Sequence, residues 1–166
     1  MKKAIVIGCP GSGKTTFAEK LKAKTGLPLF YLDAVWHKPD KTHISRPEFD
    51  ERLAEIMSLD SWIIDGNYSR TIEMRLQRCD TIIYLDFDRW QCLWGMAQRV
   101  ICNYGKHRPD MGGNCKERFD WEFVKWIWNF NEQNRTRNYT WLAQAKHAKS
   151  IVLKNRKEVK RFLEQL

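Results

Sequence analysis

The sequence lacks any long apolar run. No segment approaches the length of about 18 apolar residues that a membrane span needs, and the N-terminus has no apolar stretch of the signal-peptide kind. The five cysteines are widely spaced, odd in number and without a C-x-x-C pair, which argues against a disulfide framework. There is also no internal repeat, low-complexity tract or linker. We therefore expect residues 1–166 to form a single domain that stays in the cytosol and has no membrane partner.

Acidic residues are scarce in the C-terminal part of the chain. Residues 1–98 carry 14 basic and 13 acidic side chains, whereas residues 99–166 carry 15 basic and 7 acidic, so the second part supplies nearly all of the net charge of +9. Such an excess favours anionic partners, either the phosphates of a nucleotide and its acceptor or a nucleic-acid backbone. The excess of positive charge could also serve solubility alone. The net charge therefore does not distinguish a nucleotide partner, a nucleic-acid partner and a role in solubility.

Apolar, β-branched runs alternate with helical patterns along the chain. Strands are predicted at residues 4–7, 29–32, 62–65, 81–86 and 150–153, and helices at about 14–25, 45–58, 89–104 and after residue 153. Alternation of this kind predicts an α/β fold of three layers, in which helices cover both faces of a parallel sheet. The carboxyl ends of the strands then meet along one edge, where ligands bind in such folds.

The segment Gly8–Thr15 matches the phosphate-binding pattern G-x-x-x-x-G-K-[ST] and lies between a predicted strand and a predicted helix, as the motif requires. Its glycines let backbone N–H groups face phosphates, and the following helix adds the positive end of its dipole. Lys14 is expected to reach the β- and γ-phosphates of ATP, and the Thr15 hydroxyl to bind Mg²⁺. The residues predicted to hold the nucleotide are Gly8, Pro10, Gly11, Ser12, Gly13, Lys14, Thr15 and Thr16.

The longer pattern Gly8-x-Pro-Gly-Ser-Gly-Lys-Thr-Thr16 resembles the nucleoside-monophosphate kinase and shikimate kinase group. Asp65-Gly-Asn-Tyr68 is similar to the Asp-Gly-aromatic segment of adenylate kinases, in which the acidic residue helps to hold the Mg²⁺ shell through water. The resemblance implies an ATP-dependent kinase with a P-loop fold, a sheet of order 2-3-1-4-5, a lid after the fourth strand, and a metal site at Thr15 and Asp65.

The chain is also similar to small bacterial P-loop proteins described as adenylate-kinase-like or as "topology modulation" proteins. The shared features are Leu-Asp33-x-x-Trp36, Asp65-Gly-Asn-Tyr68 and an aromatic-rich segment at residues 119–130. In this chain Asn67-Tyr68 stands where adenylate kinases have an aromatic residue and proline, and the arginine comes one position later, at Arg70. That departure argues against an AMP-type acceptor.

Asp33 follows the predicted second strand and is expected to face the ligand crevice, although an aspartate there can instead cap a turn. Shikimate- and gluconate-type kinases have an aspartate at the matching place that contacts the acceptor hydroxyl. The resemblance implies that Asp33 orients that hydroxyl or accepts its proton. Trp36, Tyr68 and Arg70 complete the expected acceptor site, and the alternative for Trp36 is packing under a loop.

Residues 99–118 are predicted to form the inserted lid, because they are basic and contain a Gly-, Pro- and Asn-rich stretch too irregular for a long helix. Arg99 resembles the lid-entry arginine of the family, and Arg108 is the second candidate. With Lys14 and Asp33 they make up the predicted catalytic residues. The alternative for this stretch is a solvated basic loop.

Two features are expected in the helix after the lid. Arg135 and Arg137 could face the site, but their spacing of two residues places at most one of them inward. An apolar stripe at helical spacing is predicted to face the core, formed by Phe119, Phe123, Trp126, Ile127 and Phe130.

The alternative to a kinase is an ATP-binding, nucleic-acid-associated protein whose basic C-terminal part contacts phosphates. No helix-turn-helix, RNP or zinc-finger pattern supports specific base reading, so a nucleic-acid partner is left open but not favoured. A third hypothesis is an ATP-hydrolysing switch. The sequence has no sensor or arginine-finger pattern that would support it. The expected partners are therefore ATP with Mg²⁺ and a small-molecule acceptor. The sequence leaves open the identity of the acceptor and the oligomeric state of the protein.

Overall fold

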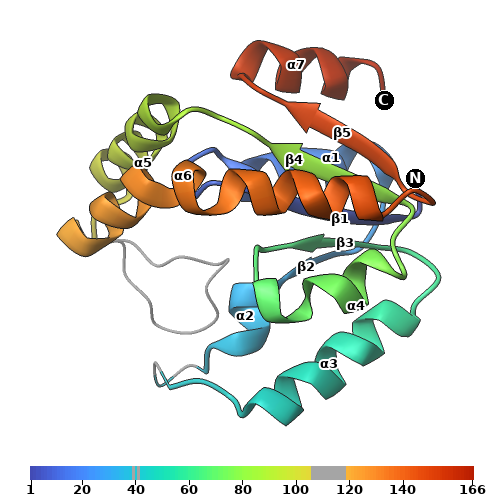
Figure 1. Ribbon diagram of the computed structural model, residues 1–166. Coiled ribbons are helices and arrows are strands. Elements are labelled where there is room, and N and C mark those ends of the chain that lie inside the picture. The colour runs from blue at the N-terminus through green and yellow to red at the C-terminus, as the bar shows by residue number, and fades with distance from the viewer. Residues whose placement is uncertain (39, 41, 106–118) are drawn as a thin grey trace.

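The computed structural model describes residues 1–38, 40, 42–105 and 119–166. Five parallel strands form one sheet: β1 (Lys3–Gly8), β2 (Leu29–Tyr31), β3 (Trp62–Asp65), β4 (Thr81–Leu85) and β5 (Lys149–Leu153). Their order is β2-β3-β1-β4-β5, and helices lie on both faces (Figure 1). The predicted α/β fold and its strand order are confirmed. Within the described ranges, no helix is long and apolar enough to span a membrane.

The three central strands are short apolar runs that are buried on both faces. All residues of β3 and β4 are buried, as are the last five of β1, and most of these side chains are Ile, Val or Leu. β-Branched residues favour extended backbone, and a parallel sheet covered on both faces requires such continuous apolar segments. The register places Gly8 opposite Leu85 and Val6 opposite Asp65, so the ends of β1, β3 and β4 lie along one edge.

One face of the sheet is covered by α1 (Lys14–Thr25), α5 (Arg89–Asn103) and α7 (Arg156–Glu164). Phe17 of α1, Cys92 of α5 and Leu163 of α7 are buried together with Val6 and Leu85 of the sheet. This first core cluster also takes in the start of α6 (Trp121–Gln144), which runs against α5.

The opposite face is covered by α3 (Arg46–Ser58), the short helices α2 (Leu32–Trp36) and α4 (Ile72–Leu76), and the second half of α6. Phe49 of α3, Ile72 of α4 and Trp141 of α6 are buried there with Ile64 and Tyr84 of the sheet. In Figure 1, α6 runs along the sheet in front of β4 and β1. A 3₁₀ turn, Ser69–Thr71, leads into α4.

Two local expectations differ from the structure. The second strand ends at Tyr31 rather than at residue 32, so Asp33 lies in the first turn of α2 and not directly at the end of the strand. The predicted apolar stripe of α6 is buried only at Ile127 and Phe130, because Phe119 precedes the helix and Trp126 remains 45% exposed.

Helix α5 lies directly against the loop between β1 and α1. A Cβ atom added at Gly95 would come within 2.1 Å of the Gly11 carbonyl oxygen, and one added at Gly11 within 2.2 Å of the Cys92 carbonyl oxygen. Gly11 also has a φ of +82°, which residues with a side chain rarely adopt. The loop and the helix therefore meet backbone to backbone, and both glycines are required by the contact.

Replacing Gly95 by alanine tests this contact, because the packing determines whether the free energy of unfolding rises or falls. In an ordinary helix interior the change stabilises by about 1 kcal/mol. Here the added methyl group meets the Gly11 carbonyl, so we expect the free energy of unfolding to fall by about 1–3 kcal/mol in urea titrations. Gln98→Ala, on the exposed side of the same helix, should change it by less than about 0.5 kcal/mol. A Gly95→Ala protein more stable than the wild type would contradict the packing described.

Candidate functional site

The loop from Gly8 to Gly13 carries β1 into α1 through a tight turn. The Ser12 N–H donates to the Cys9 carbonyl oxygen at 3.1 Å, and Gly13, with a φ of +87°, precedes the helix without a side-chain cap. The Lys14 ammonium also donates to the Cys9 carbonyl oxygen, at 3.1 Å, so its side chain folds back across the loop. The N–H groups of the first turn of α1 and the Lys14 charge together suit an anion such as a phosphate group.

Thr15 and Asp65 meet beside this loop. The Thr15 hydroxyl donates to Asp65 Oδ2 at 3.1 Å, and Asp65, the last residue of β3, is only 6% exposed. A hydroxyl and a carboxylate are oxygen ligands of the kind that Mg²⁺ prefers in proteins. The two residues therefore fit a magnesium ion bound next to phosphate groups.

One amide side chain ties the loop after β3 to the phosphate-binding loop. The Gly8 N–H donates to Asn67 Oδ1 at 3.0 Å, and Asn67 Nδ2 donates to the Gly8 carbonyl oxygen at 2.9 Å. Gly8 lies opposite Leu85 on its other side, in the ladder with β4. The first residue of the phosphate-binding loop is thus held by both neighbouring segments.

The loop after β3 is itself held by a buried guanidinium. Arg75 of α4 is fully buried and donates to the carbonyl oxygens of Gly66, Asn67 and Tyr68 at 2.8, 2.8 and 2.9 Å. Burial lowers the pKa of Arg75 to about 9, which is still high enough for the side chain to stay charged at pH 7. A buried charge satisfied by three carbonyl dipoles imposes one conformation on the segment that carries them.

Tyr68 adopts an unusual backbone conformation in this loop. Its φ of +21° is uncommon for a residue with a side chain. The phenol ring stacks on Phe49 with centroids 5.2 Å apart, and the hydroxyl donates to Asp33 Oδ1 at 2.9 Å. Burial, and then the charge of Asp33, raise the pKa of the Tyr68 phenol, so it remains a hydrogen-bond donor at physiological pH.

The remaining expected acceptor residues lie near Tyr68. Trp36 is half-buried, stacks on His43 with centroids 4.8 Å apart, and meets the Phe49 ring edge-on at 5.5 Å. Arg70 makes two hydrogen bonds to Asp50, at 2.8 and 2.7 Å, and its guanidinium lies 5.9 Å from the centre of the Phe49 ring. Arg70 is therefore engaged at the rim of the aromatic cluster rather than directed at Asp33.

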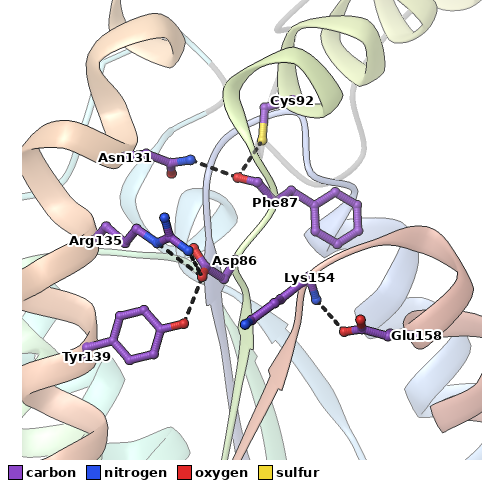
Figure 2. Close-up of polar contacts among 8 residues, drawn as sticks. All are labelled: Asp86, Phe87, Cys92, Asn131, Arg135, Tyr139, Lys154 and Glu158. Carbon is purple, nitrogen blue, oxygen red and sulfur yellow. Dashed lines mark hydrogen bonds and ion pairs between the residues drawn. The ribbon is translucent and has the colours of Figure 1, made fainter.

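A second carboxylate lies at the same edge of the sheet. Asp86 directly follows β4, is 5% exposed, and accepts from Arg135 Nε at 3.2 Å, Arg135 Nη2 at 2.8 Å and the Tyr139 hydroxyl at 2.8 Å. Figure 2 shows Arg135 and Tyr139 converging on Asp86 from α6. One turn earlier, Asn131 Nδ2 donates to the Phe87 carbonyl oxygen at 2.8 Å, so one stripe of α6 is bound to the end of β4.

Arg137 points elsewhere on α6. It hydrogen-bonds Asn134 and lies 5.1 Å from the centre of the Trp141 ring. Of the two arginines considered from their spacing, Arg135 is thus the one at the edge of the sheet. Of the two predicted lid arginines, Arg99 belongs to α5, and its guanidinium lies 5.6 Å from the centre of the Phe123 ring. Arg108 lies outside the described residues, as does most of the predicted lid.

The structure brings Thr15 together with Asp65 and Asp33 together with Tyr68, while Lys14 contacts the Cys9 carbonyl oxygen. The roles expected of these residues stay predictions. Sequence reasoning assigned no role to Arg75, Asp86, Tyr139 or Gly95. Asp86 carried a usable signal, because it ends a predicted strand as Asp65 does. Arg75 carried none, because a single arginine in a helical pattern reads as an exposed residue.

Replacing Arg75 by methionine removes the donor of all three loop carbonyls while keeping an unbranched side chain. We expect the free energy of unfolding to fall by about 3 kcal/mol, because buried acceptors lose their partners, and MgATP affinity to fall with it. Urea titration and calorimetric titration with MgATP measure the two effects. Arg78→Met, at an exposed arginine just after α4, is the matched control. Equal stability of the two variants would contradict the role given to Arg75.

No protein-family model matches the chain, and no curated protein sequence matches it. Among solved structures, an unliganded sugar kinase from Janibacter sp. HTCC2649 is similar, with a TM-score of 0.54 and 15% sequence identity over 99% of this chain and 91% of that chain. At this level of identity the likeness concerns the fold. The chain therefore shares its architecture, over nearly its whole length, with a protein described as a sugar kinase.

Proposed function

We propose that this protein is an ATP-dependent kinase that transfers the terminal phosphoryl group of ATP to a hydroxyl group of a small molecule. The observation that carries the proposal is the arrangement of two polar pairs at adjacent strand ends. Thr15 and Asp65 form one pair beside the phosphate-binding loop, and Asp33 and Tyr68 form the other. Between Asp65 of the first pair and Tyr68 of the second, the chain has only residues 66 and 67. The architecture shared with a sugar kinase is in keeping with this proposal.

The nucleotide half of the site uses residues of β1, α1 and β3. The backbone of residues 8–13 and Thr16 cradle the phosphates, and Lys14 turns from the Cys9 carbonyl toward the β- and γ-phosphates. Thr15 and Asp65 hold Mg²⁺, which neutralises charge on the phosphates when it is bound. Gly11 and Gly13 allow the loop to approach the phosphates closely because they have no side chain.

The acceptor half is centred on Asp33. Its carboxylate accepts the proton of the acceptor hydroxyl as that oxygen forms a bond to the γ-phosphorus, while the bond from the γ-phosphorus to the bridging oxygen breaks and ADP leaves. The Tyr68 hydroxyl holds Oδ1 of Asp33 and so orients the carboxylate. The rings of Trp36 and Tyr68 form an apolar wall, and Arg70 has to leave Asp50 to contact an acceptor.

Arg99 and Arg108 complete the proposed machinery. Positive charge near the transferred phosphoryl group stabilises the transition state, and closure over the site excludes water. We assign these duties to Arg99 at the end of α5 and to Arg108 in the segment that follows it, which lies outside the described residues.

The test of the proposal is acceptor-dependent release of ADP. The protein is mixed with MgATP and with nucleosides, nucleoside monophosphates, sugars and small hydroxy acids in turn, and ADP is measured. We expect one class of acceptor to raise ADP release and Lys14→Ala to reduce that rate at least 100-fold. ADP release that no acceptor changes, together with salt-dependent nucleic-acid binding that survives in Lys14→Ala, would favour the nucleic-acid-associated alternative instead.

The role of Asp33 predicts a specific kinetic pattern. Asp33→Asn should lower kcat by about 100-fold, because the amide cannot accept a proton, while KM for ATP stays within about twofold of the wild type. Tyr68→Phe should show a smaller fall in kcat, since it loses only the orienting hydrogen bond. Asp60→Asn, an exposed aspartate before β3 at the opposite edge of the sheet, serves as control. An Asp33→Asn enzyme with full kcat would rule out this assignment.

A further inference from the structure

Helices α5 and α6 each expose a row of large apolar side chains. On α5, Trp90, Trp94 and Ile101 share one side of the helix, because steps of four and seven residues return to nearly the same direction. On α6, Trp121 and Trp128 are seven residues apart and also share one side. A different side of each helix is buried in the first core cluster. The two rows therefore point away from the core. We call these five side chains the apolar face.

The two rows belong to one continuous surface. Near the start of α5, the rings of Trp90 and Trp128 meet edge-on with centroids 5.2 Å apart. Near its end, the Arg99 guanidinium lies over the ring of Phe123. The two helices therefore run in opposite directions, and Trp121 lies toward the end of α5. Packed against each other, α5 and the beginning of α6 form one end of the molecule (Figure 1).

The exposed area of this face is large for a monomer. Trp90, Trp94, Trp121 and Trp128 are 67, 63, 60 and 39% exposed, and Ile101 is 78% exposed. At about 250 Å² for a whole tryptophan, the four tryptophans alone expose about 570 Å² per copy. The largest apolar patch on a monomer usually covers about 300–600 Å². Two such faces would remove roughly 1,100 Å² from water before Ile101 and the flanking residues are counted, and a stable interface needs roughly 1,200–2,000 Å². The face therefore has the size of one half of a dimer interface.

The charge around the apolar face argues against an anionic partner. The segments that carry the face, residues 88–103 and 119–132, have three basic and four acidic residues: Arg89, Arg99 and Lys125 against Asp88, Asp120, Glu122 and Glu132. Nucleic-acid backbones and anionic lipid surfaces are bound by an excess of lysine and arginine, which these two segments do not have. Two copies of a chain with a net charge of +9 repel each other, and the repulsion is smallest where the surfaces that meet are nearly neutral.

We propose that the apolar face of α5 and α6 is the interface of a homodimer, in which two copies of the chain meet about a twofold axis. A twofold interface uses the same patch on both copies, which suits a face that is apolar and carries little net charge. The α5 and α6 helices of the two copies then bury their rows against each other as the helices of a four-helix bundle do. Tryptophan is also enriched in the buried centre of such interfaces. The inference does not rest on the proposed function, because the face contains none of the residues assigned to the nucleotide or the acceptor.

Sedimentation velocity of the full chain at about 1–100 µM tests the proposal, because this range spans the affinities of moderate to tight dimers. We expect the wild type to sediment with the mass of two chains. Trp94→Glu and Ile101→Glu each place a carboxylate in the face of both copies, so each should raise the Kd of the dimer by at least about 100-fold. Leu59→Glu, at an exposed leucine between α3 and β3, is the matched control and should leave the Kd unchanged.

Each outcome decides the matter. Thermal unfolding shows whether each variant folds, and either of the two α5 variants gives the result if the other does not fold. A wild type that stays monomeric at about 100 µM overturns the inference, and so does a dimer that both folded α5 variants leave intact. Binding of a monomer to a single-stranded oligonucleotide or to phosphatidylserine vesicles, if lost in Trp94→Glu, would also overturn it and assign the face to that partner. None of these results depends on ADP release, so the failure of this inference leaves the proposed kinase standing.

Discussion

The buried guanidinium of Arg75 is the interaction on which the rest of the site depends. It donates to three successive carbonyl oxygens after β3 and so fixes the backbone of the segment that follows Asp65. The positions of the Asn67 side chain, which reaches Gly8, and of the Tyr68 ring depend on this backbone. A charge in the interior has to be satisfied by hydrogen bonds, and here those bonds all go to one loop. The loop therefore cannot relax without exposing the charge or leaving it unpaired. Through Asn67 the same constraint passes to Gly8, the first residue of the phosphate-binding loop.

The polar groups that are costly to bury gather at the carboxyl edge of the sheet. Asp65, Asp86 and Arg75 are all almost or fully buried there, and Tyr68 has an unfavourable φ of +21° in the same region. The core on either face of the sheet consists of apolar side chains and needs none of these features. Proteins tolerate such costs where a fixed arrangement of polar groups serves binding or chemistry. The costly buried groups and the phosphate-binding motif therefore point to the same edge of the sheet as the candidate site.

The features of the fold and site that the sequence predicted are those formed by residues close together in the chain. The strands and the phosphate-binding loop follow from short motifs and their place between strand and helix, and the structure confirms the strand order. A shared site at Thr15 and Asp65 was implied only by the resemblance to adenylate kinases. The clasp of Asn67 on Gly8 joins residues 59 positions apart, and that of Arg135 on Asp86 joins residues 49 apart. Neither spacing has a motif. Gly95 was equally hidden, because only the approach of Gly11 gives that glycine a reason. Asp33 was expected directly after a strand and lies in a helical turn, since an apolar run does not show where the strand ends.

The central claim is that residues 8–16 and Asp65 hold MgATP with its terminal phosphate directed at Asp33. The most direct measurement is a crystal structure of the protein with ADP, Mg²⁺ and aluminium fluoride, which mimics the phosphoryl group in transfer. The account predicts the metal ion next to the Thr15 hydroxyl and the fluoride group between Lys14 and Asp33. A nucleotide bound away from the loop, or a fluoride group remote from Asp33, would contradict the account.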